Sequence, residues 1–473
     1  MKILRQIAIL LLLLGSLAAQ KTPGPAPLPA ELPPAGPLKP VVSPPVVQRR
    51  LANGMSVWMV ERADLPKVVF VLTARGGDSL DPASSPGLAR LMARAMTQGT
   101  TSQSSRQIAE AAQATGGDLS ATANADATEV TLDVLSEHAG DAVALLADIA
   151  QNANFPENEV ALAKSNMEDQ LRANEATPRF LARRAWYQVT YGDHPYSIVF
   201  PTMKTLEQAT PESLRSLYAQ NLRPDQALLV VVGSFDQAEL AAQIEKAFGA
   251  WKSGVAATAL VREPAAKAEH KIYLLDRPGS VQTTMLIGGI APTLRDPDEP
   301  YLMLANTIYG GSFASRLTRN IREDKGYTYS PFSFLTNFRW SATILTSEDV
   351  RNQVTGPSLK ETFYELNRIS TEAPSAAELD SARRYLIGNT ALDVQSRGSL
   401  ATLLGKYWVN NLPADHLTAE MTALQKADVS QVGKAAARYL APDRMSVVAV
   451  GEKSVMQEQF KPFGLAMVPA PQP

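Results

Sequence analysis

Two adjoining stretches in the second half of the chain decide the fold: GGSFASRL at residues 310–317 and IREDKGYTYS at residues 321–330. The glycine pair ends a helix predicted over Tyr301 to Ile308. A second helix is predicted from Phe313 to Glu323, and strands are predicted over Tyr327 to Phe334 and Ser341 to Thr346. The predicted unit is therefore a helix, a glycine break, a second helix and paired strands. A duplicated fold should show the same order of elements in the first half of the chain.

The first half of the chain repeats this plan, roughly 210 to 220 residues earlier, a spacing typical of duplicated domains. A helix with apolar positions from Leu88 to Met96 follows Pro86-Gly87, and a second one runs from Ser105 to Gln113 before the Gly116-Gly117 break. Strands through 128–135 and helices over 139–152 and 157–174 follow. The second half begins with strands over 272–275 and 283–287 and continues with a long helix over 354–370. We therefore predict domains at 47–251 and 270–460, a connector at 252–269 and a tail at 461–473.

Composition excludes several classes of protein. The chain has 473 residues, 45 Lys and Arg against 47 Asp and Glu, and a formal net charge of −2, so no excess of positive charge recruits nucleic acid or anionic membrane. The absence of cysteine excludes disulfides, a thiolate nucleophile and Cys-ligated metals. No two of the four histidines lie within one helical turn, which excludes a local histidine zinc motif.

The N-terminus has the pattern of an export signal. Lys2 and Arg5 precede an apolar run over 7–14 and a small-residue end, which predicts a signal peptide over 1–20. The alternative, a membrane span, needs about 20 apolar residues. Residues 21–46 are rich in proline, so we expect a semi-rigid tether, with partner binding as the alternative. The predicted location is the periplasm or the medium, without a membrane span in the mature form.

The ordered motifs resemble those of the insulinase/pitrilysin family, closest to its branch of mitochondrial-processing-peptidase-like proteins. In the first half they are LANG at 51–54, GGDS at 76–79, PGLA at 86–89, QGT at 98–100 and GGDL at 116–119; in the second half, DRPGSVQ at 276–282 joins the two stretches above. The likeness covers about residues 47–460. It implies an α+β fold of two duplicated domains, each an antiparallel-rich sheet flanked by helices, which together form half of a clamshell.

Active members of that family carry His-x-x-Glu-His on the first helix, where residues i and i+4 share a face and bind zinc. In this chain the ligand positions hold Arg90 and Arg94, and the water-activating position holds Ala93. The third ligand, a Glu in a long helix, falls on Gln170. We expect no metal in this chain, because an arginine side chain cannot deprotonate to become a ligand.

The two arginines have two interpretations. They are either solvated charges on a helix surface or binders of a peptide carboxylate or an acidic partner. Gln170 is expected to be a neutral polar residue that lines a cavity.

The second half keeps a pair that the resemblance identifies as functional. Active relatives use an Arg and a Tyr seven residues later to bind the substrate backbone and stabilise the oxyanion, and Arg322 and Tyr329 match that spacing. Otherwise, Arg322 caps its helix or pairs with Glu323 or Asp324, and Tyr329 is a strand aromatic. Gly310, Gly311 and Ser312 resemble a glycine loop that handles substrate, although the residues alone indicate only a turn.

These observations lead to one main hypothesis. The chain is a non-catalytic subunit of a heterodimeric, exported zinc peptidase, without independent activity. It binds unfolded peptide and gives Arg322 and Tyr329 in trans to a homologous partner that holds the zinc. The alternatives are a stand-alone peptide-binding or scaffold protein of the cell envelope, and a lone metallopeptidase with carboxylate-only zinc ligands.

Overall fold

The computed structural model describes residues 36–252, 263–265, 267 and 269–471. The predicted signal peptide, most of the Pro-rich segment and most of the connector lie outside these residues. Pro40–Pro473 forms one compact unit. The end of the Pro-rich segment belongs to this unit, because the backbone N–H of Ser43 donates to the Thr418 hydroxyl at 2.9 Å. Among the helices of the described residues, none combines the length and apolarity that a membrane crossing requires.

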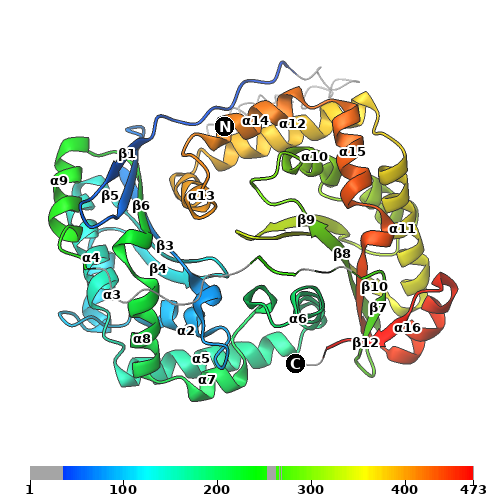
Figure 1. Ribbon diagram of the computed structural model, residues 1–473, viewed down its shortest axis with the longest axis horizontal. Helices are drawn as coiled ribbons and strands as arrows, with labels where there is room; N and C mark the ends of the chain where they lie inside the picture. The colour runs from blue at the N-terminus through cyan, green and yellow to red at the C-terminus, as the bar shows by residue number, and fades with distance from the viewer. Residues whose placement is uncertain (1–35, 253–262, 266, 268, 472–473) are drawn as a thin grey trace, which may run out of the picture. The chain divides into compact units, whose positions relative to one another are not determined.

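The described strands form two six-stranded sheets, one in each half (Figure 1). The first has the order β1-β2-β6-β3-β5-β4, and the second has the order β12-β7-β11-β8-β10-β9. The five strands from β2 to β6 thus occupy the same places as those from β7 to β11. β2 runs parallel to β6, as β7 does to β11, and the remaining neighbours among these strands are antiparallel. This repetition confirms the predicted α+β fold of two similar halves.

The first half contains six strands and eight α-helices in the described residues. The strands are β1 (Val47–Arg50), β2 (Ser56–Glu61), β3 (Lys67–Arg75), β4 (Asp118–Ala123), β5 (Ala127–Leu135) and β6 (Ala227–Gly233). The helices are α2 (Leu88–Met96), α3 (Ser105–Ala114), α4 (Ala139–Asn152), α5 (Glu157–Glu175), α6 (Pro178–Tyr191), α7 (Met203–Gln208), α8 (Pro211–Asn221) and α9 (Gln237–Phe248).

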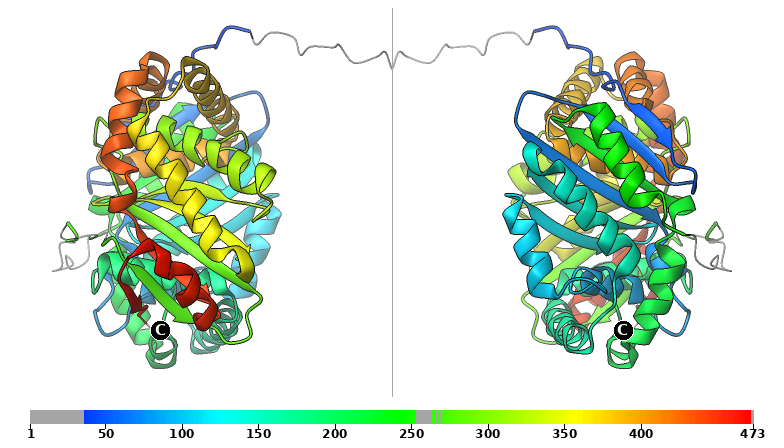
Figure 2. Two further views of the ribbon diagram at one scale, coloured as in Figure 1. Left: turned by 90° about the vertical axis from the view of Figure 1, so that its right-hand side faces the viewer. Right: turned by 90° about the vertical axis from the view of Figure 1, so that its left-hand side faces the viewer.

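The second half is built in the same way. Its strands are β7 (Ile272–Asp276), β8 (Gln282–Ala291), β9 (Phe332–Asn337), β10 (Ala342–Arg351), β11 (Ser446–Gly451) and β12 (Met467–Pro469). Its helices are α10 (Glu299–Tyr309), the π-helix η5 (Thr318–Asp324), α11 (Thr355–Thr371), α12 (Ala376–Asp393), α13 (Arg397–Val409), α14 (His416–Lys426), α15 (Val429–Tyr439) and α16 (Lys453–Phe460). Figure 2 shows helices lying over the outer side of each sheet.

Three expectations for the second half need correction. The chain turns between Phe313 and Ser315, and a short helix then widens into the π-helix η5, instead of one α-helix from Phe313. The segment from Tyr327 to Pro331 is a loop, because its backbone leaves η5 before pairing with β10 begins at Phe332. The predicted tail contains β12, which pairs with β7 and extends the second sheet beyond residue 460.

The central strands of both sheets are buried along their whole length. Every residue of β6 and β11 is buried, which fits their continuous runs of Val, Leu and Ala. Strands of this kind must be packed against other elements on both faces of their sheet. In each half, one face packs against a helix from the other half: α13 packs on β3 and β6, and α6 packs on the equivalent strands β8 and β11.

Polar contacts fix both exchanged helices. Beside α13, the Arg75 guanidinium stacks on Trp408 at 3.9 Å and donates to its carbonyl oxygen at 2.5 Å. Beside α6, Arg179 forms an ion pair with Asp349 of β10 at 2.5 Å, and Tyr191 donates to Ser341 at 3.1 Å. The two halves are therefore interlocked.

A single glycine allows α13 to approach the first sheet. A Cβ at Gly405 would lie 2.8 Å from the Thr73 hydroxyl oxygen of β3. We expect Gly405→Leu to lower the free energy of unfolding by about 1–3 kcal/mol, because the buried β-branched Thr73 has little room to move. The same substitution at Gly388 of α12, where a Cβ meets nothing within 4 Å, is the control. Urea unfolding that shows equal stability for both variants would contradict this packing.

Candidate functional site

Helix α2 carries the positions at which a zinc motif would lie. It begins after Gly87, whose φ of +86° and closeness to Pro201 leave no room for a Cβ. The Asp81 carboxylate caps this end by accepting the backbone N–H groups of Gly87 at 2.6 Å and Ala89 at 2.8 Å. Burial and the neighbouring Asp78 raise the pKa of Asp81 to about 8. Ala93 is fully buried and only fills the core.

Arg90 is held by a buried carboxylate. Its Nη2 and Nε donate to Asp78 Oδ2 at 2.6 and 2.9 Å, and its Nη1 donates to the Val199 carbonyl at 2.8 Å. The Asp78 side chain is fully buried. Both interpretations from the sequence are therefore wrong for Arg90, which is neither a solvated charge nor free to bind an external anion. Burial raises the pKa of Asp78, and the adjacent guanidinium opposes that rise.

Arg94 and Gln170 are both exposed and lie side by side, so the expectation that Gln170 lines a cavity was wrong. Arg94 Nη1 donates to Gln170 Oε1 at 3.4 Å. Thus α2 and α5 still bring together the positions of the second and third ligands, but with a cation and a neutral amide. Within the described ranges, no group of three or more His, Asp or Glu side chains could hold a metal ion. The residues at these positions do not fit zinc, because the guanidinium groups of Arg90 and Arg94 offer no lone pair to a metal and Gln170 offers only a neutral amide oxygen.

Gly310, Gly311 and Ser312 form the turn that follows α10. The N–H groups of Gly310 and Gly311 both donate to the Asn306 carbonyl, at 2.8 and 2.7 Å, and the Ser312 hydroxyl donates to the Thr307 carbonyl at 3.0 Å. A Cβ on Gly310 would lie 2.8 Å from Ser333 of β9. The turn is therefore closely packed against β9, and its role towards substrate stays a prediction.

Arg322 and Tyr329 are neighbours in space. The Arg322 guanidinium carbon lies 4.6 Å from the centre of the Tyr329 ring and 4.5 Å from the centre of the Phe313 ring. Tyr329 is 80% exposed and Phe313 is 64% exposed. The cation is thus stacked between two surface aromatic rings, an arrangement that fixes its direction and leaves its N–H groups available to a carbonyl oxygen.

The loop that carries Tyr329 is anchored to the interlocked halves. The Thr328 hydroxyl donates to the Asp349 carbonyl at 2.8 Å, and the Asp349 carboxylate holds Arg179 of α6. Arg322 lies on η5, and π-helical turns are frequent at functional sites. The ion pair between Asp349 and Arg179 of the first half was not visible in the sequence.

Two residues of the site were missed as partners in the sequence analysis. Asp78 belongs to the quoted GGDS motif, and a carboxylate in an otherwise apolar, glycine-rich segment is a signal that a cation must be near. Phe313 belongs to the quoted GGSFASRL motif, but its stacking on Arg322 requires the turn that replaced the predicted helix.

Comparisons with known proteins agree with this architecture. The family model described as "Insulinase (Peptidase family M16)" matches residues 59–200, and the model described as "Peptidase M16 inactive domain" matches residues 208–386. A Bacillus subtilis protein named "Uncharacterized zinc protease YmxG" is 26% identical over 360 residues, which cover 75% of this chain and 86% of that protein.

Two solved structures are similar over most of the chain. The crystal structure of a peptidase M16 inactive domain from Pseudomonas fluorescens has a TM-score of 0.80 and 25% identity, and the match covers 90% of this chain and all of that one. The first half of the periplasmic protease PqqL from Escherichia coli has a TM-score of 0.70 and 16% identity, and the match covers 89% and 95% of the two chains. The second likeness shows the fold alone.

The Arg90–Asp78 pair generates a prediction about stability. We expect Arg90→Met to lower the free energy of unfolding by about 3 kcal/mol, because it leaves the Asp78 charge buried without a partner. The double variant Arg90→Met/Asp78→Asn should regain part of that loss. Arg94→Met, on the exposed face of the same helix, is the control and should change stability by less than about 0.5 kcal/mol.

The pH dependence of this series has a definite sign. Without Arg90 the pKa of Asp78 rises further above its unfolded value, so the unfolded state ionises first as the pH increases. The stability deficit of Arg90→Met should therefore grow from pH 4 to pH 8, as measured by urea unfolding. A deficit that stays constant over this range would show that Asp78 is not the group left unpaired.

Proposed function

The chain belongs to the insulinase family of peptidases, M16, and on this basis we propose that it is a non-catalytic subunit of an exported zinc peptidase. In this role it binds peptide substrate and supplies Arg322 and Tyr329 to a homologous partner subunit that holds the zinc ion. The observation that carries the proposal is the exposed stack of Phe313, Arg322 and Tyr329 in a chain whose residues at the zinc-motif positions of α2 and α5 do not fit a metal.

The chemistry of the stack suits a carbonyl oxygen that gains negative charge. A guanidinium donates charge-assisted N–H bonds, and a phenol O–H adds a neutral donor. Donors fixed in advance stabilise an oxyanion without reorganising during the reaction. Stacking between two rings and anchoring of the loop through Thr328 both supply this fixation. The zinc ion and the base that activates water would come from the partner.

Peptide binding is supported by the free edge of the first sheet. β4 is an outer strand whose residues alternate between exposed and half-buried, and its only strand partner among the described residues is β5. An extended peptide can add to such an edge through backbone hydrogen bonds. Backbone hydrogen bonds do not distinguish one peptide sequence from another, so selectivity for particular peptides has to come from pockets that bind their side chains.

Two further points support the quaternary and cellular parts of the proposal. The Escherichia coli relative is described as the first half of a periplasmic protease, so this fold occurs as one half of a larger enzyme. Residues 1–20 have the composition of an export signal.

The experiment is co-expression with a homologue from the same genome that carries His-x-x-Glu-His. We expect Arg322→Ala and Tyr329→Phe each to lower kcat of the purified pair by about 10²–10³-fold, because each removes an oxyanion donor. Arg106→Met, on exposed α3, is the control and should leave kcat unchanged. If the pair with either site variant cleaves peptides as fast as the wild-type pair, trans donation is refuted. If no pair forms and the chain alone binds peptide, the chain is a stand-alone binding protein and the subunit hypothesis fails.

Phe313 should matter by holding Arg322. Phe313→Ala removes one ring of the stack, so we expect a loss of kcat of roughly tenfold with little change in KM, since a cation–π contact contributes up to about 2 kcal/mol. Phe313→Tyr keeps the ring and should restore the rate. Equal rates for the Ala and Tyr variants would show that the ring does not position Arg322.

A further inference from the structure

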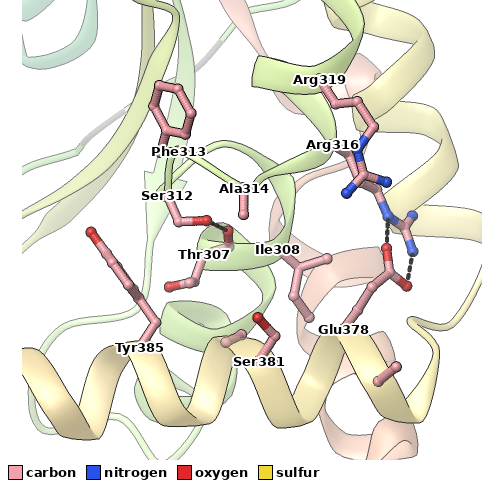
Figure 3. Close-up of a pocket in the computed structure, with 12 residues that line it drawn as sticks. Thr307, Ile308, Ser312, Phe313, Ala314, Arg316, Arg319, Glu378, Ser381 and Tyr385 are labelled. Atoms are coloured by element: carbon pink, nitrogen blue, oxygen red, sulfur yellow. Dashed lines mark hydrogen bonds and ion pairs between the residues drawn. The ribbon is translucent and has the colours of Figure 1, made fainter. Parts of the chain in front are cut away.

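A pocket of about 420 Å³ opens beside the Arg322 stack, between the end of α10, the Gly310–Ser312 turn and α12. Phe313 and Tyr385 stand at one end of it, and Arg316 and Arg319 stand at the other (Figure 3). Phe313 is also one of the two rings that hold Arg322. Phe313 therefore links the pocket to the proposed substrate contact at Arg322.

The charges in this pocket do not balance. Arg316, only 8% exposed, donates from Nε and Nη2 to the two carboxylate oxygens of Glu378, at 2.7 and 3.0 Å. This pairing lowers the pKa of Glu378 to about 2, so the carboxylate is ionised at neutral pH and cancels one positive charge. Arg319 also lines the pocket. Arg319 lies three residues after Arg316, on the same side of the helical turn, and adds a second positive charge.

No described residue forms an ion pair or a side-chain hydrogen bond with the Arg319 guanidinium. Arg319 also lines a neighbouring cavity with Asp324 and Glu361, but neither carboxylate comes within the 4.0 Å of an ion pair. A further arginine atom, Arg316 Nη1, is buried without a hydrogen-bond acceptor in the described part of the chain. The arginine end of the pocket thus has donors in excess of acceptors.

We propose that this pocket is a subsite for a peptide group that ends in a carboxylate. The group would enter between Phe313 and Tyr385, pack its carbon atoms against these rings and Ile308, and present its carboxylate to Arg319. Guanidinium and carboxylate match in geometry and charge. The hydroxyl of Ser381, which also lines the pocket, offers a further donor. The inference deepens the proposed function, since the occupant would belong to the peptide whose backbone Arg322 contacts.

Two sources supply such a carboxylate: an Asp or Glu side chain, or the free C-terminus of the peptide. The test uses the purified chain and a fluorescent ten-residue peptide in four forms, with Glu or Gln in its middle and with a free or amidated C-terminus. Binding is followed by fluorescence anisotropy at low salt. We expect at least tenfold tighter binding for one carboxylate form than for its neutral counterpart, and the form that gains identifies the source.

Arg319→Met should abolish this preference, and the variant should still fold, because Arg319 is exposed and supports no described ion pair. Arg319→Glu should reverse it in favour of a Lys-containing peptide. Arg106→Met, with its side chain 87% exposed on α3, is the control and should keep the wild-type preference. Circular dichroism and the Tm of each variant confirm that it is folded.

Equal affinity for charged and neutral peptides, a preference that survives Arg319→Met, or no binding of any form would each overturn the subsite. These outcomes are independent of the paired-enzyme experiment. If Arg322→Ala leaves the pair fully active while Arg319→Met still removes the carboxylate preference, the proposed function fails and the subsite stands.

Discussion

Each sheet of this protein depends on a helix from the other half to bury its second face. The central strands β6 and β11 are buried throughout, and α13 and α6 cover them reciprocally. An isolated half would expose one face of these strands to water, and it would lose the apolar burial that drives folding. The exchange also reaches the candidate site: Asp349, which holds α6 through Arg179, anchors the loop of Tyr329.

The two halves share the same strand order but present different side chains at their surfaces. In the first half, α2 presents arginine and alanine at the zinc-motif positions, and Arg90 is paired with the buried Asp78. In the second half, a cation is held at the surface between two rings that remain exposed. This contrast between the two halves is consistent with the proposed role as a subunit that completes a zinc-bearing partner.

Much of the fold was predictable from the sequence, because it is encoded locally. Apolar periodicity gave α4 at its observed bounds, and the glycine pairs marked the ends of helices. The motif order predicted the duplication, and it singled out Arg94 with Gln170 and Arg322 with Tyr329, which are neighbours in the structure.

Features that depend on distant partners were missed. To predict the exchange of α6 and α13, one must know which sheet faces are left unpacked. To predict the pairing of Arg90 with Asp78, one must know the direction of the Arg90 side chain. The π-helix η5 was predicted as an α-helix, because a change in hydrogen-bond register leaves no mark on apolar spacing.

The most direct test of the central claim is a crystal structure of the purified pair with a bound peptide, with zinc located by anomalous scattering. We expect one zinc ion per pair, bound by the partner subunit, with Arg322 and Tyr329 of this chain converging on the carbonyl oxygen of the bond nearest the metal. Zinc between α2 and α5 of this chain, or an Arg322 stack that faces away from the peptide, would contradict it.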